Sequence, residues 1–114
     1  MNVSEQQILD RYRELAVQWA GLRDDPKKAN RVFKLHHAYY QEIRGTPEGQ
    51  RALRALLKDP EAAVRLLAAT HLLPFAANEA EPVLMELERG GDVYAMDAKY
   101  TLMNHRAGRL DLDW

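Results

Sequence analysis

Four histidines give this chain of 114 residues its widest chemical range, because histidine can bind a metal, transfer a proton or anchor an interface. Three of them recur at intervals of 34 positions: His37, His71 and His105. A second series, of positive charge, follows the same interval: Arg31, Arg65 and Lys99. Residues at one position of successive structural repeats form a row along one face. The spacing therefore predicts either a binding face or an internal structural ladder.

The histidine spacing argues against a metal site. Zinc needs three or four ligands within about 2.1 Å of the ion, whereas adjacent helices lie about 8–10 Å apart. His36 and His37 are adjacent instead of four positions apart, and the chain contains no cysteine. We expect His36 to be a hydrogen-bonded core residue, and we expect no bound metal and no cofactor.

Carboxylate and nucleophile chemistry is also poorly supported. Acidic residues are plentiful after position 78, but nothing in the sequence marks two of them as a matched acid and base. The chain has no G-x-S-x-G motif, no phosphate-binding loop and no G-x-G-x-x-G motif. We therefore expect no catalytic residues and no enzymatic activity.

Helix start signals recur along the whole chain. Each combines a capping residue with a proline or a glutamine in the first turn, at Ser4 with Gln7, Asp25-Pro26, Thr46-Pro47 and Asp59-Pro60, and Asp92 adds a further cap. With the breaks at Pro74 and Gly90-Gly91, they predict six helices in one domain spanning residues 1–114. The Pro60–Leu73 helix is apolar almost all round, so we place it at the centre of the core. No segment alternates apolar and polar residues as a strand would.

The 34-residue interval aligns longer stretches as well. Residues 25–33 match residues 59–67, with Asp-Pro followed by alanine and arginine at the same places, and the third copy is degenerate. The segment from Leu56 to Ala69, with its Asp-Pro start, Val-Arg pair and small alanines, resembles the HEAT repeat. The chain also looks like a family of short, uncharacterised bacterial HEAT-like proteins.

This resemblance implies an all-α fold, a short right-handed solenoid of three antiparallel helix pairs. It carries over no catalytic residues. Tetratricopeptide repeats have the same period and stay as the alternative, although their Trp, Leu-Gly and Tyr signature is missing here. HEAT-like solenoids bind proteins on the face lined by their second helices, so the resemblance favours a non-catalytic protein-binding module that neutralises or scaffolds a partner.

The candidate binding residues combine the repeated row with aromatic anchors. They are Arg31, His37, Tyr40, Arg65, His71, Tyr94, Lys99 and His105. We expect His37 and His105, in the outer repeats, to lie outside the core, and at least two of Tyr40, Tyr94 and Tyr100 to be mostly buried. The C-terminal tail, residues 111–114, would either dock on the last helix pair or engage a partner.

Charge is unevenly distributed along the chain. Residues 1–58 carry 11 Lys and Arg against 7 Asp and Glu, a balance of +4, while the remainder carries 5 against 10, a balance of −5. The asymmetry would favour weak homo-oligomer formation. A basic edge over Lys27–Lys34 makes nucleic-acid binding the alternative function, against which the pI near 6.4 argues. The sequence shows neither an apolar leader nor a long apolar run, so we expect no membrane partner and a cytoplasmic location.

Overall fold

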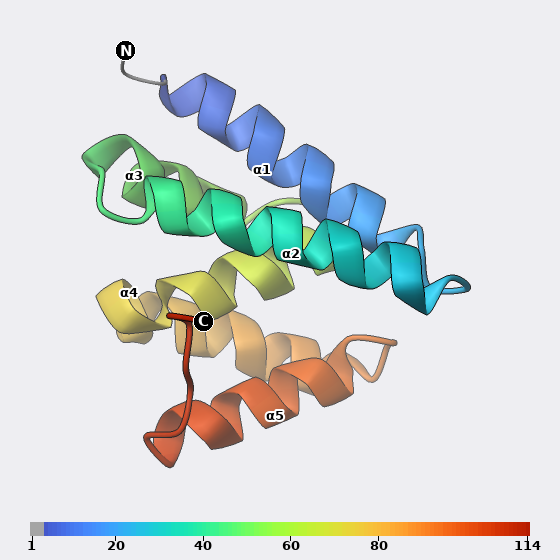
Figure 1. Cartoon of the computed structure of the whole chain (residues 1–114). Helices are drawn as coiled ribbons and strands as arrows, with labels where there is room; N and C mark the ends of the chain where they lie inside the picture. Colours follow the sequence, from blue (N-terminus) through green and yellow to red (C-terminus); the bar gives the residue numbers. More distant parts are fainter. Residues whose placement is uncertain (1–3) are drawn as a thin grey trace.

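Five α-helices account for most of the chain in a computed structural model that describes residues 4–114. In chain order they are α1 (Glu5–Ala20), α2 (Pro26–Ile43), α3 (Pro47–Leu56), α4 (Ala62–Gly90) and α5 (Ala95–Arg106) (Figure 1). No strand occurs within that range, as the sequence predicts. The prediction that the sequence shows no apolar leader draws partly on residues 1–3, which lie outside the part of the chain that the structure describes.

Local capping explains where the first three helices begin. The Ser4 hydroxyl accepts a hydrogen bond from the Gln7 N–H at 3.1 Å, and the Gln7 side chain accepts one from the Ser4 N–H at 2.9 Å. Asp25 and Thr46 each accept from the backbone N–H three residues further on, at 3.1 and 2.9 Å. These bonds satisfy donors that have no partner within the helix. The predicted starts of α1, α2 and α3 are confirmed.

α4 differs from the prediction, which expected two separate helices in this region. It is one element of 29 residues with a sharp break at Ala76, where φ is −152° and ψ is 60°. Pro74 lies two residues before the break and cannot supply the N–H that would continue the helix. The two predicted helices are thus the two arms of α4. Its first arm begins at Ala62, two residues after Pro60.

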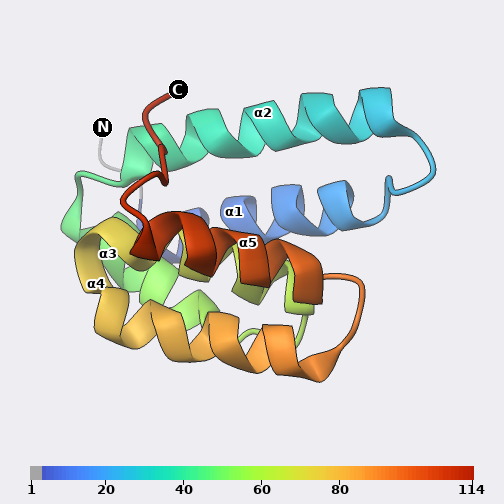
Figure 2. The ribbon, with the colours of Figure 1, turned by 90° about the horizontal axis from the view of Figure 1, so that it is seen from below.

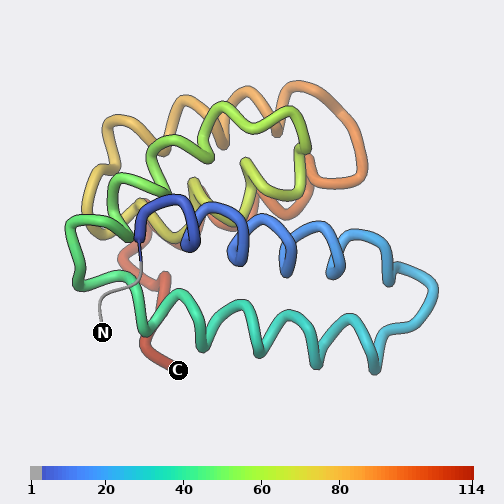
Figure 3. Tube along the Cα trace, turned by 90° about the horizontal axis from the view of Figure 1, so that it is seen from above, coloured from blue at the N-terminus to red at the C-terminus, as the bar shows by residue number. Residues whose placement is uncertain are grey.

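The helices pack mainly against neighbours in the chain. α1 and α2 run side by side in opposite directions, and so do the second arm of α4 and α5 (Figure 2 and Figure 3). α1 also packs on α3, and α3 on α4. Val64, Ala68, Ala69 and Leu72 of the first arm of α4 are fully buried, which confirms that the apolar segment lies at the centre.

After α5 the chain turns at Gly108, which has a φ of 70°, and the tail crosses from α5 to α2 (Figure 2). A left-handed backbone of this kind favours glycine, which lacks a Cβ. None of the helices formed by residues 4–114 combines the length and the apolar content needed to cross a lipid bilayer.

Candidate functional site

Three of the predicted binding residues meet inside the protein instead of on a surface. His37, Tyr40 and His71 are buried, and they pack with Tyr12 and His36 between α1, α2 and α4. We call these five residues the buried ring cluster. Tyr40 stacks on His71 with ring centroids 3.8 Å apart, and the Tyr12 hydroxyl shares a hydrogen bond of 2.6 Å with His71 Nδ1.

Burial keeps the histidines of this cluster neutral. Burial, followed by the neighbouring His37, lowers the pKa of His36 to about 3, and burial, followed by His36 and His37, lowers the pKa of His71 well below its usual value. The pKa of His37 is also lowered, first by burial and then by the nearby Arg44. Nε2 of His36 and of His37 has no hydrogen-bond partner among the described residues, so the expected hydrogen-bonded role of His36 is not seen at that atom.

The C-terminal tail covers one side of the cluster. The Trp114 ring stacks on His37 with centroids 3.7 Å apart and planes 4° apart. Arg44 donates to Asp113 at 2.6 Å, and the Gln41 amide donates to the Trp114 carbonyl at 3.2 Å. The tail therefore docks on α2 and not on the last helix pair. Its contact explains why the expectation that His37 lies outside the core is wrong.

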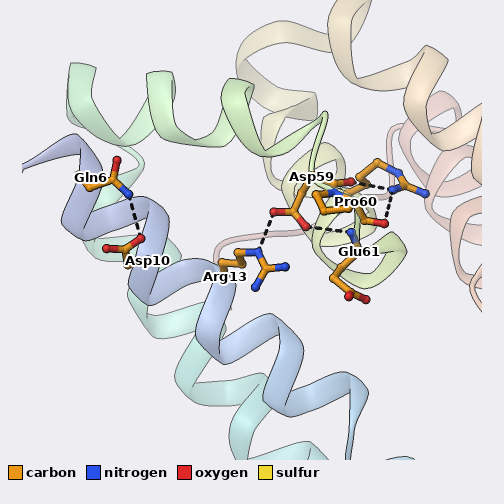
Figure 4. Close-up of polar contacts among 7 residues, drawn as sticks. Gln6, Asp10, Arg13, Asp59, Pro60 and Glu61 are labelled. Carbon is orange, nitrogen blue, oxygen red and sulfur yellow. Dashed lines mark hydrogen bonds and ion pairs between the residues drawn. The ribbon is translucent and has the colours of Figure 1, made fainter.

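Arg65 has an internal role at the start of α4. Its guanidinium donates to the carbonyl oxygens of Asp59 and Pro60, at 2.7 and 3.0 Å. The Asp59 carboxylate accepts from Arg13 of α1 at 2.9 Å and from the Glu61 N–H at 2.9 Å (Figure 4). The N-cap of α4 is Glu61, with no side-chain cap, so the prediction that Asp59 caps this helix is wrong. Asp59 instead holds the turn before α4 and links that turn to α1.

The remaining predicted residues are spread over the surface. Arg31 and Lys99 are exposed, and Tyr94 and His105 are half-buried. Tyr94 packs beside Trp19, with ring centroids 6.0 Å apart. Tyr100 is more than half exposed, whereas Tyr40 is fully buried and Tyr94 packs against the core, so the expectation that at least two of the three tyrosines would be mostly buried is confirmed. His105 has no part in the buried ring cluster, and the three-histidine row does not form.

An open cleft of about 380 Å³ lies between α1, α2, the first arm of α4 and α5. Its walls carry three aromatic rings, Trp19, Phe33 and Tyr100. Leucines form the apolar lining: Leu66, Leu67 and Leu110. Its polar side chains are Thr70, Asp97, Thr101 and Asn104. We call this site the aromatic cleft. A volume of this size suits a small ligand or the anchoring side chains of a partner.

The outer face of α5 continues the apolar surface beside this cleft. Three of its residues, at spacings of four and three, are each more than half exposed: Met96, Tyr100 and Met103. Val93, in the turn just before α5, is exposed as well and extends this surface. Ala98 and Leu102 are the buried residues of α5. A surface helix ordinarily exposes a polar face, so apolar residues on both faces mark α5 as an unusual element. We call the four exposed residues the α5 stripe.

The sequence did not single out the aromatic cleft or the α5 stripe. Trp19 and Phe33 match the period of core residues, and their position at an opening depends on helix packing. The stripe was detectable, because the spacing of Val93, Met96, Tyr100 and Met103 is visible in the sequence. No group of three His, Asp or Glu side chains between residues 4 and 114 is arranged so that it could hold a metal ion.

Comparison with known proteins gives the fold and no function. No family model matches the sequence, and no curated protein matches it. The chain is similar in structure to the protein RPA1889 from Rhodopseudomonas palustris CGA009, whose crystal structure superposes with a TM-score of 0.86. The match covers 96% of this chain and 94% of that chain at 21% sequence identity. The protein therefore shares its all-helical fold with a bacterial protein of known structure.

Proposed function

We propose that this chain is a non-catalytic module that binds a protein partner in the cytoplasm, and that the α5 stripe and the aromatic cleft form its binding surface. The observation that carries the proposal is the stripe, an exposed apolar face on a helix that already buries its other face. Exposed apolar patches of this kind mark interaction sites. Methionine and tyrosine are also enriched in protein interfaces.

The composition of the cleft favours binding over catalysis. Its lining contains one carboxylate, Asp97, and no histidine. General acid–base chemistry needs positioned groups of suitable pKa, and the histidines with lowered pKa values are packed away in the buried ring cluster.

A HEAT-like arrangement remains part of the proposal. α1 with α2, α3 with the first arm of α4, and the second arm of α4 with α5 would be the three antiparallel pairs of a short right-handed solenoid. Packing of α1 on α3, and of α4 on α5, supports this assignment. The end of such an array ordinarily carries a polar capping face, so the apolar α5 stripe on the last helix is unusual for a terminal repeat and supports a binding role.

Capture followed by quantitative binding tests the proposal. The double variant Tyr100→Ser with Met103→Ser should weaken affinity for the partner isolated from native lysate by at least about tenfold, as expected for interface anchors. Leu35→Ser is the matched control, because Leu35 is equally exposed but lies on α2 outside the stripe. Isothermal titration calorimetry with the purified partner gives the affinities, and melting temperatures verify that the variants fold.

Two results would contradict the proposal. One is full affinity in the stripe variant. The other is capture that disappears after nuclease treatment, which would favour the nucleic-acid alternative. In that case the exposed Lys27, Lys28, Arg31 and Lys34 on α2 would be the residues to substitute.

A further inference from the structure

The aromatic cleft has a single charge, and that charge is negative. Asp97 is the only charged residue in its lining. Its side chain is exposed, and it takes part in none of the ion pairs formed by residues 4–114. Asp97 also lines an adjoining hollow of about 220 Å³ with Trp19, Arg23 and Tyr94. A carboxylate in this position favours a ligand that carries positive charge.

The rings around Asp97 favour the same kind of ligand. Trp19 lies 5.9 Å from Phe33 and 6.0 Å from Tyr94, measured between ring centroids, and Tyr100 faces the cleft from α5. Aromatic faces attract cations through the negative potential above the ring, and tryptophan does so best. The site therefore combines an apolar lining, several aromatic rings and one anion.

We propose that the aromatic cleft binds an arginine side chain presented by the partner protein. This inference rests on the proposed function and specifies the chemistry of the partner. A guanidinium is planar, stacks on aromatic rings and can bond a carboxylate through two parallel N–H groups, whereas an ammonium is a compact and strongly hydrated charge. The protein already shows such a contact at the edge of the site, where the guanidinium of its own Arg23 lies 5.8 Å from the centroid of the Tyr94 ring.

Asp97 also lies in the first turn of α5, where a carboxylate stabilises the helix through its dipole. That structural role predicts a small loss of stability on substitution and no effect on ligands. The arginine-binding role predicts a loss of affinity that depends on the charge of the ligand. The two roles are separable by measuring the melting temperature and the affinity of the same variant.

The probe is a blocked glycine-rich pentapeptide with one central arginine, compared with the same peptide containing citrulline, a neutral analogue of nearly equal shape. Titration is followed by amide and indole NMR on the full chain. We expect the arginine peptide to shift the Trp19 indole signal and to bind about tenfold more tightly than the citrulline peptide. Asp97→Asn should remove this preference, while Glu86→Gln, which removes an exposed charge on α4, should retain it.

Equal affinity for the two peptides, an unchanged preference in Asp97→Asn, or no response of Trp19 would each overturn the inference. The comparison of peptides on the unmodified chain needs no variant to fold. The peptide comparison can fail separately from the stripe experiment because it uses the unmodified chain, whereas the stripe variant also removes the Tyr100 ring from the cleft. If the arginine peptide does not bind preferentially but the stripe variant still loses capture of the partner, only the arginine proposal is rejected. If the stripe variant keeps full affinity for the partner, the proposed function is rejected.

Discussion

The buried ring cluster and the aromatic cleft are built on the same two helices, yet one is closed and the other is open. α1 contributes Tyr12 to the cluster and Trp19 to the cleft, seven residues apart and so on the same side of the helix. α2 contributes His36 and Tyr40 to the cluster and Phe33 to the cleft. The pattern of residue types along these helices does not distinguish the two regions.

The elements that pack against α1 and α2 explain the difference between the two regions. At the cluster, His71 of α4 fills the space between the helices, and Trp114 of the tail covers His37. At the cleft, α4 presents the smaller Thr70 together with leucines, and α5 stands far enough away to leave an opening. The comparison teaches that large rings on two facing helices form a core or a binding site according to the third element that meets them.

The largest expected effect tests the closed region. Tyr12→Ala removes a fully buried ring together with the partner of His71 Nδ1, so it should lower the free energy of unfolding by about 3–5 kcal/mol. Tyr100→Ala is the matched control at the open region and should stay within about 0.5 kcal/mol of the parent, as other exposed substitutions do. Urea denaturation measures both changes. If the two variants lost similar amounts of stability, the distinction between the closed ring cluster and the open cleft would be wrong.

Acid should weaken the closed region selectively. The clustered histidines stay neutral in the folded protein, while those of the unfolded chain bind protons as the pH falls through about 6.5. Their contribution is therefore fully present above that pH and is lost as the pH falls toward the folded pKa of His36, about 3. Between pH 7 and 5, a histidine that stays neutral in the folded state should cost about 2 kcal/mol of stability.

Denaturation curves at several pH values measure this loss. His36→Phe keeps a ring against Tyr12 but cannot titrate, so its stability should depend less on pH. Met103→Ala, which removes an exposed side chain that carries no titratable group, is the control and should leave the dependence unchanged. If His36→Phe loses as much stability in acid as the parent does, the histidines are not the origin of the effect.

The tail should contribute the smallest effect. Trp114→Ala removes the stack on His37, a contact worth about 1 kcal/mol, because the ring is half exposed and aromatic pairs contribute about 0.5–1.5 kcal/mol. Trp114→Phe retains a stacking ring and should lose less. Thermal unfolding ranks the three proteins, and a Trp114→Ala variant as stable as the parent would mean that the tail does not close the cluster.

Much of the fold was predictable because its signals are local. Ser4, Asp25 and Thr46 cap helices through bonds that span three residues, and Pro74 precedes the break in α4. The site was predicted less well. The 34-residue interval correctly paired His37 with His71 but extended the row to His105, which the packing of α5 places elsewhere.

The sequence by itself determined the starts of α1, α2 and α3 and the break after Pro74, because capping and proline effects act within one turn. The caps predicted at Asp59 and Asp92 are not formed, and α4 and α5 begin instead at Ala62 and Ala95 without a side-chain cap. Only the tertiary structure decided which rings are enclosed. Tyr12 and His71 are 59 positions apart, and their contact exists only once α1 and α4 are packed. The burial of His37 depends in the same way on the tail that returns from α5 to α2. Side chains of the same type therefore lie in the core or in the cleft according to which distant elements pack against them. No local sequence pattern encodes that packing.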